Sequence, residues 1–275
     1  MKLVYPTFYR VLFVDVDSCI TAIEGIDELA RLHGREVKVA ELTKKAMQGE
    51  VLLEEVFEKR LALINPRKED LQKVAERYVE TITPDAVEVI RILVGMGVEV
   101  RLISAGYQEA ILPLAIHMGL AENKMHANSL YFNLEGEYSG FDRSNPLWQK
   151  NGKKKVIESL KQKREIPEGR IAIIGDGVSE LETEPATDFR IGFGGHQIRD
   201  RVKELADVFI QANSFAALLL LVLDTSRIQQ LAGDSAKRKL LQKGFEQLQS
   251  EVVFSKQAQG LKQDLKEIEF ELRGL

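Results

Sequence analysis

Four short stretches of the chain consist almost entirely of apolar and β-branched residues, and each ends at a polar or glycine-rich turn. They are VLFV before Asp15, VEVRLIS ending at Ser104, RIAIIGD ending at Asp176, and DFRIGFGG ending at Gly195. Helical patterns lie between them, and runs of this length and composition are typical of buried strands. The pattern therefore predicts an α/β fold with a parallel sheet, in which ligands bind outside the carboxyl ends of the strands.

A long stretch without a strand pattern, about residues 23–81, separates the first strand from the second. It contains EGIDELARLHG, VAELTKKAMQG and VLLEEVFEKRLALI, in which apolar residues recur at helical spacing. We expect a helical cap over the ligand-binding edge of the sheet. The chain then divides into a core of residues 1–22 and 82–224, a cap of residues 23–81, and a tail of residues 225–275. Within the core, SLYFNLEGEYSGF alternates apolar and polar residues and predicts a hairpin beside the sheet.

The tail is charged, glutamine-rich and free of proline. Its apolar residues form two heptad-like series, namely Leu241, Phe245, Leu248 and Val252, and then Leu261, Leu265, Ile268 and Leu272. We expect a helical tail, although Gly244 and Gly260 argue against one uninterrupted coiled coil. A helical hairpin folded onto the core and a helix that binds a partner or a second copy of the chain both fit this pattern.

Composition and charge narrow the class of protein. The 275 residues are 44% hydrophobic, which suffices for one large or two modest globular domains. The formal charge of −4 predicts no general attraction to nucleic acid or to anionic membranes. The most apolar run, residues 215–223, is far shorter than the roughly 20 residues of a membrane-spanning helix, so we expect a buried helix there. One cysteine and the lack of a signal-peptide pattern favour a reducing, cytoplasmic setting.

Acidic residues follow two of the predicted strands. Asp15 and Asp17 are spaced so that both side chains lie on one face at the end of the first strand. Two neighbouring carboxylates repel each other, and Mg²⁺ suits such a pair because it binds hard oxygen ligands together with waters and phosphate. Asp176, in a GDG turn, is a natural further ligand. Short acidic pairs are also common in solvated turns, so this motif alone is weak.

Two other residues fit the binding of phosphate. Ser104 follows the second strand, where its hydroxyl and the adjacent N–H groups can donate to phosphate oxygens, and Lys153 opens a predicted helix, where a cation and free N–H groups favour an anion. Taken singly, a serine before a turn is usually a cap and a lysine triplet is usually a solvated face. Their order along one sheet, between the acidic pair and the final acidic loop, strengthens the phosphate hypothesis.

This series of motifs resembles the haloacid-dehalogenase superfamily of phosphotransferases, and within it the phosphoserine phosphatases. The matching segments are DVDSCI, EGIDELA, AMQGEV, KRLALINP, LISAGY, LEGEYSGFD, NGKKKVI, GDGVSELE and IGFGGHQIR. The resemblance implies a Rossmann-like core with an inserted cap, Mg²⁺ as cofactor, and a small phosphomonoester as substrate. That substrate would be O-phospho-L-serine, hydrolysed in the last step of serine biosynthesis.

The resemblance also implies roles for individual residues. Asp15 would attack phosphorus to form an aspartyl-phosphate, and Asp17 would protonate the leaving group and then activate water. Asp15, the backbone carbonyl of Asp17, and Asp176 would hold Mg²⁺, while Ser104 and Lys153 would hold phosphate oxygens.

The amino-acid part of the substrate would be bound at the cap. The resemblance implies that Glu24 binds its ammonium group, that Arg60 binds its carboxylate, and that Met47, Leu53 and Ala105 line the same site. Closure of the cap would exclude water. Without the resemblance, Glu24 is an ordinary residue near a helix start and Arg60 an ordinary residue on a helix surface.

Several positions depart from the family pattern. Cys19 stands where the family usually has threonine, Leu53 where it has phenylalanine, and Ala105 where it has glycine. Glu180, beside Ser179, stands where the family has an aspartate, and its extra methylene displaces a carboxylate that can still orient a metal-bound water. A thiol is a weak hydrogen-bond partner, and a Cβ at position 105 is unfavourable if the backbone there needs a positive φ.

These departures leave two alternatives open. One is a phosphatase for another small phosphomonoester, which Leu53 and Ala105 would favour. The other is a catalytically inactive relative that acts as an interaction module through residues 225–275. Two further readings are rejected, because GFGGHQ lacks the third glycine of a dinucleotide-binding motif and Cys19 has no obvious histidine partner that would make it a nucleophile.

Overall fold

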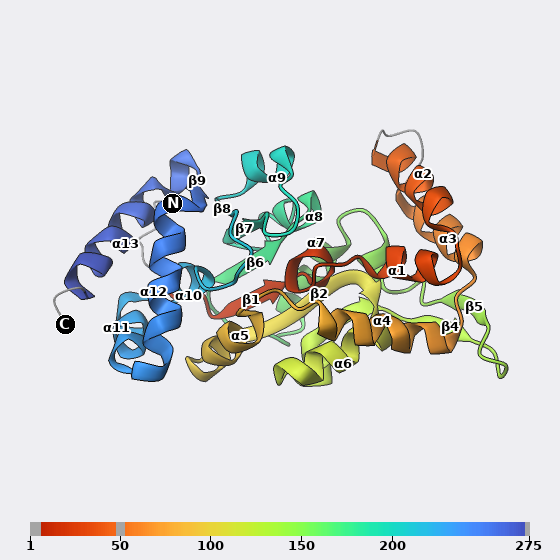
Figure 1. Cartoon of the computed structure of the whole chain (residues 1–275), viewed down its shortest axis with the longest axis horizontal. Helices are drawn as coiled ribbons and strands as arrows, with labels where there is room; N and C mark the ends of the chain where they lie inside the picture. The colour runs from red at the N-terminus through yellow and green to blue at the C-terminus, as the bar shows by residue number, and fades with distance from the viewer. Residues whose placement is uncertain (1–6, 48–52, 273–275) are drawn as a thin grey trace.

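The computed structural model describes residues 7–47 and 53–272, and its centre is a seven-stranded sheet (Figure 1). The strand order is β3-β2-β1-β6-β7-β8-β9, and every neighbouring pair is parallel except β8 and β9. The strands are β1 (Val11–Val14), β2 (Glu99–Tyr107), β3 (Met125–Asn128), β6 (Ile171–Gly175), β7 (Phe189–Phe193), β8 (Val208–Ile210) and β9 (Val252–Phe254). The predicted α/β fold with a largely parallel sheet is therefore confirmed.

Helices cover both faces of this sheet, which is why its strands are apolar throughout. Leu12 and Val14 of β1 belong to a buried cluster with α5 (Ala86–Gly95) and α6 (Gln108–Met118). Val11 and Phe13 belong to a second cluster with α7 (Gly152–Gln162). Successive residues of a strand point to opposite faces, so a sheet buried on both sides needs a continuous apolar run.

The strand register brings the predicted site residues to one edge. Val14 of β1 lies beside Leu102 of β2 and Ile174 of β6. The residues that follow these three positions, which include Asp15, Ser104 and Asp176, therefore meet at the carboxyl end of the sheet, as expected for a doubly wound fold.

The stretch between β1 and β2 is helical, as predicted. It contains α1 (Gly25–Leu32), α2 (Glu36–Met47), α3 (Leu53–Ile64) and α4 (Lys68–Glu80). Figure 1 shows α1, α2 and α3 beyond one end of the sheet, whereas α4 runs along the core helix α6. The two ends of this stretch are joined by backbone hydrogen bonds. The N–H of Ala22 donates to the carbonyl of Thr81 at 2.9 Å, and the N–H of Thr83 donates to the carbonyl of Ile20 at 2.7 Å.

The predicted hairpin consists of β4 (Leu130–Phe132) and β5 (Tyr138–Phe141), which pair antiparallel. Its turn uses Gly136 with φ of +76°, a conformation that other residues rarely adopt. The carbonyl of Gly136 accepts the N–H of Lys68 at 2.9 Å, which ties the hairpin to the start of α4.

The C-terminal segment folds against the core. It contains α11 (Thr225–Gly233), α12 (Ser235–Ser250) and α13 (Gln259–Leu272), and in Figure 1 it lies at the opposite end from α2 and α3. Lys243 of α12 forms an ion pair with Asp85 at 2.7 Å, and the side-chain carbonyl of the buried Gln247 accepts the N–H of Ala217 at 2.9 Å. These contacts agree with a helical segment packed on the core.

The segment is not helical throughout. Val252, which the heptad pattern placed on a helix, starts the short strand β9, and it pairs antiparallel with Ile210 of β8 at the open edge of the sheet. Heptad spacing alone could not show this, because β-branched and aromatic residues are equally suited to a strand that covers an edge.

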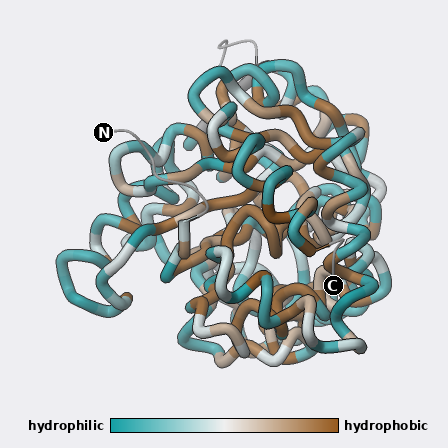
Figure 2. The backbone as a smooth tube through the Cα atoms, turned by 90° about the vertical axis from the view of Figure 1, so that its left-hand side faces the viewer, coloured by the Kyte–Doolittle hydropathy of each residue, from teal (hydrophilic) through white to brown (hydrophobic). Residues whose placement is uncertain are grey.

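The predicted buried helix at residues 215–223 is also confirmed. It corresponds to α10 (Leu218–Val222), all of whose side chains are buried. In Figure 2 the hydrophobic stretches run through the middle of the molecule and the hydrophilic ones predominate outside. Within the described residues, no helix is both long and apolar enough to cross a membrane.

Candidate active site at the carboxyl end of the sheet

Asp15 follows β1 and precedes a short kinked turn over Val16–Ile20, in which Asp17 and Ser18 have non-helical backbone angles. Its Oδ1 accepts the N–H of Val16 at 2.9 Å and lies 2.7 Å from the ammonium group of Lys153. Within the turn, Ser18 has φ of +53° and so redirects the chain toward Glu24. The short turn therefore fixes Asp15 against a cation and leaves Asp17 half-buried beside it.

Lys153 is buried at the start of α7 and contacts two carboxylates, Asp15 and Glu180. Burial opposes the charge of Lys153, but the two carboxylates outweigh it and raise the pKa of the ammonium group. Burial raises the pKa of Asp15 to about 8, although Lys153 opposes this shift. The lysine is therefore a fixed positive charge beside Asp15, the residue to which the family resemblance assigns the role of nucleophile.

Glu180 lies in α8 (Val178–Leu181) and is fully buried. Its carboxylate accepts hydrogen bonds from the hydroxyl of Ser179 at 2.6 Å and the N–H of Gly177 at 3.0 Å. The longer side chain fits because position 175 is a glycine: a Cβ there would lie 2.4 Å from the Cγ of Glu180. The replacement of the family's aspartate is thus accommodated without breaking the cluster.

Three buried carboxylates could hold a cation. One oxygen each of Asp15, Asp176 and Glu180 lies within 4.8 Å of the others. Hard oxygen donors at this spacing fit Mg²⁺ chemically. The carboxylate of Asp17, by contrast, is engaged by other donors and is not part of this cluster.

Asp17 is half-buried, and its carboxylate accepts hydrogen bonds from three donors. The N–H of Gly25 and the hydroxyl of Tyr78 donate to Oδ1 at 2.7 and 2.6 Å, and the hydroxyl of Ser104 donates to Oδ2 at 3.1 Å. Burial and the nearby Glu24 raise the pKa of Asp17 to about 6. A carboxyl group with such a pKa is suited to both giving and taking a proton near neutral pH.

Glu24 and Arg60, the expected ligands of the amino-acid part of the substrate, each make a hydrogen bond in the structure. Oε1 of Glu24 accepts the hydroxyl of Ser18 at 2.8 Å, and Arg60 of α3 is 3.4 Å from the hydroxyl of Thr43. The buried Nε–H of Arg60 has no hydrogen-bond partner in the part of the chain that is described. A buried donor without a partner is unfavourable, so this group is available to an anionic ligand.

Within the part of the chain that is described, the remaining predicted residues form no hydrogen bond or ion pair with the carboxylates of this site. The side chains of Met47 and Leu53 lie outside the described residues. Ala105 is exposed and does not have a positive φ, so its Cβ brings no backbone strain. Cys19 is fully buried, burial raises the pKa of its thiol, and its carbonyl accepts the hydroxyl of Thr83 at 2.6 Å.

Two residues that the sequence reasoning missed also belong to the site. Arg199 forms an ion pair with the carboxylate of Asp176, donates to its carbonyl at 2.9 Å, and lies 3.7 Å from Glu24. It stands a few residues after the glycine-rich turn at the end of β7, a position that could have indicated it. Tyr78 had no such signal, because only the packing of α4 brings it to Asp17.

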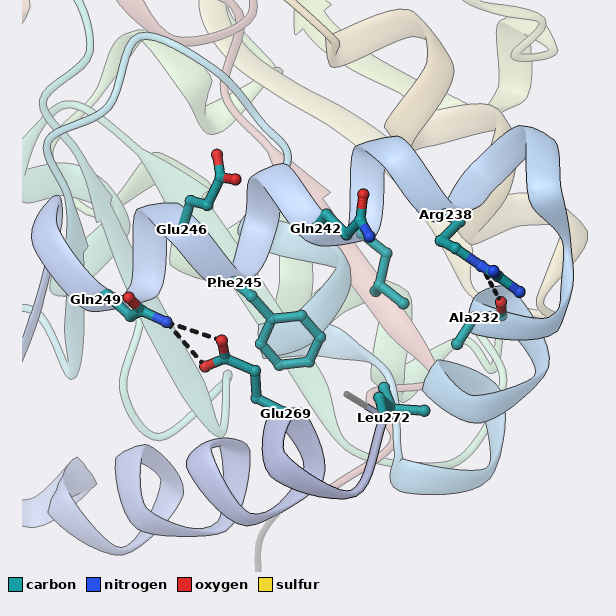
Figure 3. Close-up of a pocket in the computed structure, with 9 residues that line it drawn as sticks. Ala232, Arg238, Gln242, Phe245, Glu246, Gln249, Glu269 and Leu272 are labelled. Atoms are coloured by element: carbon teal, nitrogen blue, oxygen red, sulfur yellow. Dashed lines mark hydrogen bonds between the residues drawn. The ribbon is translucent and has the colours of Figure 1, made fainter. Parts of the chain in front are cut away.

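A pocket of about 580 Å³ lies away from this site, between the C-terminal helices (Figure 3). Its floor is apolar, with Phe245 and Leu272, while Gln249 donates to Glu269 across its rim. None of the predicted site residues lines it. The predicted site is therefore separate from this pocket.

Comparisons with known proteins agree with this arrangement. A sequence model of the haloacid dehalogenase-like hydrolases matches residues 9–183. The phosphoserine phosphatases of Bos taurus and Homo sapiens are each 39% identical over 196 residues, which is 71% of this chain and 86% of the relative. A solved substrate-bound phosphoserine phosphatase complex is 25% identical, with a TM-score of 0.64, and the match covers 79% of this chain and 100% of that chain. The chain thus belongs to the haloacid dehalogenase-like hydrolases, in the branch that contains the phosphoserine phosphatases.

Proposed function

We propose that this protein hydrolyses O-phospho-L-serine to L-serine and phosphate. The observation that carries the proposal is the convergence of Asp15, Lys153, Asp17 and Ser104 at one end of the sheet, with Lys153 2.7 Å from Asp15 and Ser104 3.1 Å from Asp17. The phosphoserine phosphatases among its relatives support the choice of substrate. Such a reaction would serve as the last step of serine biosynthesis, and a cytoplasmic setting suits it.

The two aspartates would share the reaction. A carboxylate oxygen of Asp15 attacks phosphorus, the bond to the serine oxygen breaks, and Asp17 gives its proton to that oxygen. Asp17 then takes a proton from water, whose oxygen attacks the aspartyl-phosphate and releases phosphate. Lys153 and Ser104 hold phosphoryl oxygens throughout, and Arg199 supplies a second positive charge nearby.

The amino-acid part of the substrate would lie between Glu24 and Arg60. A carboxylate suits the ammonium group, and a planar guanidinium with a free Nε–H suits the carboxyl group. Met47, Leu53 and Ala105 would line the same site. Among the described residues, Ala105 has no positive φ and so introduces no backbone strain that would favour another phosphomonoester.

A divalent cation is part of the proposal. Asp15, Asp176 and the carbonyl of Asp17 would hold Mg²⁺, and Glu180 with Ser179 would support them. When bound, the cation would neutralise negative charge on the phosphoryl group. Burial of three carboxylates near one another supports this assignment, because within the described part of the chain two cations, Lys153 and Arg199, pair with them.

The remaining proposals concern organisation. Residues 1–22 and 82–224 would form the catalytic core and residues 23–81 the cap. Residues 225–275 could still support a dimer or bind a partner, through surfaces that remain exposed on α13, such as Phe270.

The direct test is phosphate release from L-phosphoserine, with and without Mg²⁺, against a panel of small phosphomonoesters. We expect selective turnover that requires Mg²⁺ and disappears in Asp15→Asn. A higher rate on another ester would replace phosphoserine as the proposed substrate, while the proposed phosphatase mechanism would stand. No turnover on any ester would favour the inactive interaction module.

A further inference from the structure

We propose that Tyr78 is a positioning residue that restricts proton transfer to one oxygen of Asp17, namely Oδ2. This inference rests on the proposed function, because it concerns the acid and base steps assigned there to Asp17. It adds a residue outside the motifs that identify the family, and it assigns the chemistry to one atom.

The hydrogen bonds to Asp17 are unequal at its two oxygens. Oδ1 accepts the hydroxyl of Tyr78 at 2.6 Å and the N–H of Gly25 at 2.7 Å. A carboxylate oxygen has two lone pairs in the carboxylate plane, so these two short bonds occupy both of them. Oδ1 therefore has no lone pair left to carry the transferred proton.

Oδ2 accepts one longer hydrogen bond, and we expect bound substrate to break it. The hydroxyl of Ser104 donates to it at 3.1 Å and at the same time accepts the N–H of Gly106 at 2.8 Å. A hydroxyl has a single proton, so once Ser104 donates to a phosphoryl oxygen it can no longer donate to Asp17. Binding of the phosphoryl group would thus free Oδ2 for the leaving group while Oδ1 stays fixed.

Tyr78 is well placed for a fixed role. Tyr78 belongs to α4 and its side chain is fully buried. The surrounding packing therefore holds the phenol in one orientation, in which its hydroxyl donates to Asp17. Position 25 must be small for this contact, because a Cβ on Gly25 would lie 2.2 Å from the Tyr78 hydroxyl oxygen. Both donors to Oδ1 come from the helical stretch between β1 and β2, so this stretch orients the acid and base group directly.

The first test removes only the hydroxyl, in Tyr78→Phe. With one lone pair of Oδ1 free, the carboxylate can rotate or carry its proton on the wrong oxygen. We expect kcat on L-phosphoserine to fall at least tenfold, while KM stays within about twofold, because the groups proposed to bind the substrate are unchanged. The matched control is Tyr9→Phe, which removes a hydroxyl from another fully buried tyrosine, one that stacks on Phe189 away from the site.

A second pair of variants separates positioning from packing. Gly25→Ala should lower both the melting temperature and kcat, because its Cβ collides with the Tyr78 hydroxyl. In the double variant Gly25→Ala with Tyr78→Phe, the clash with the hydroxyl is removed, and the remaining close contact is that of the new Cβ with the ring carbon Cζ at 3.2 Å. We expect the melting temperature to recover in part while kcat stays as low as in Tyr78→Phe alone.

The outcomes are distinguishable. If the wild-type protein turns over phosphoserine and Tyr78→Phe matches it in kcat, the role of Tyr78 is refuted and the proposed function stands. An equal loss in Tyr9→Phe, or recovery of kcat together with stability in the double variant, would show that packing explains the effect. If the wild-type protein hydrolyses no phosphomonoester, the proposed function fails, and the inference about Tyr78 fails with it.

Discussion

The ring of Phe57 in α3 lies 6.3 Å from the ring of Trp148 in the core, and both pack on Phe141 of the hairpin, at 5.0 and 5.2 Å. Beside this aromatic cluster, Arg143 forms an ion pair with Glu58. The cluster joins the helix that carries Arg60 to the core. It therefore fixes how far that helix stands from Asp15 and Asp17.

Trp148 is the only tryptophan of the chain, so its fluorescence can report the docking of α3. In Phe57→Leu the smaller side chain leaves the cluster partly unpacked and admits water to the indole ring. We expect a red-shifted emission maximum and a higher KM for phosphoserine, by roughly threefold to tenfold, which corresponds to about 1 kcal/mol of lost aromatic contact. Emission spectra and steady-state kinetics would check this.

The control for that variant is Phe270→Leu, since Phe270 is 81% exposed on α13. Its emission spectrum and KM should match those of the wild-type protein. An unchanged spectrum in Phe57→Leu would mean that the cluster does not respond to the packing of α3.

Lys153 can be tested against a neighbour on the same helix. Lys153→Met removes the buried cation between Asp15 and Glu180, and with it the charge that would stabilise phosphoryl oxygens. We expect phosphate release to fall by at least about 100-fold. Lys155→Met, which loses an exposed lysine that donates to Gln149, should keep most of the activity. Comparable rates in the two variants would contradict the assignment of Lys153 to the phosphate site.

The sequence predicted the sheet and the residues at its edge because both depend on local signals. Apolar runs that end in Asp15 or Asp176 reveal a strand and its turn together, and the parallel arrangement then brings the turns to one side. Ser104 lies at the same side, although β2 continues past it to Tyr107. The sequence did not indicate Tyr78 and Arg199 as site residues, because their positions at the site depend on tertiary packing. The strand β9 was not predicted for a related reason. Val252 fits a heptad pattern, and it is the pairing with the edge strand β8 that makes this segment extended.

His126 makes the stability of the protein depend on pH. Burial, together with Arg101 and Lys124, lowers the pKa of His126 to about 4. Its Nε2 lies 3.1 Å from the guanidinium of Arg101, and it must accept there because arginine has no acceptor. Between pH 6.5 and 4 the unfolded chain binds a proton that the folded chain does not, so stability falls as the pH is lowered through this window.

The full difference in pKa corresponds to at most about 3 kcal/mol of unfolding free energy. We expect His126→Gln to flatten the decline of stability between pH 6.5 and 4, as measured by urea unfolding at several pH values. His117→Gln, at an exposed position of α6, should leave the decline as it is in the wild-type protein. Parallel pH profiles for the wild-type protein and His126→Gln would show that other groups cause the acid sensitivity.

Two glycines of the C-terminal segment should respond in opposite ways to alanine. A Cβ on Gly244, inside α12, would lie 2.8 Å from the carbonyl oxygen of Ala216, so Gly244→Ala must push the helix away from the core. We expect a net loss of about 1–2 kcal/mol in the free energy of unfolding, because overpacking outweighs the gain in helix propensity. Gly260, in the first turn of α13, has no atom within 4 Å of such a Cβ, so Gly260→Ala should stabilise the protein by about 0.5 kcal/mol. Denaturant unfolding of both variants would measure the difference, and a stabilised Gly244→Ala would mean that α12 does not pack closely on the core in solution.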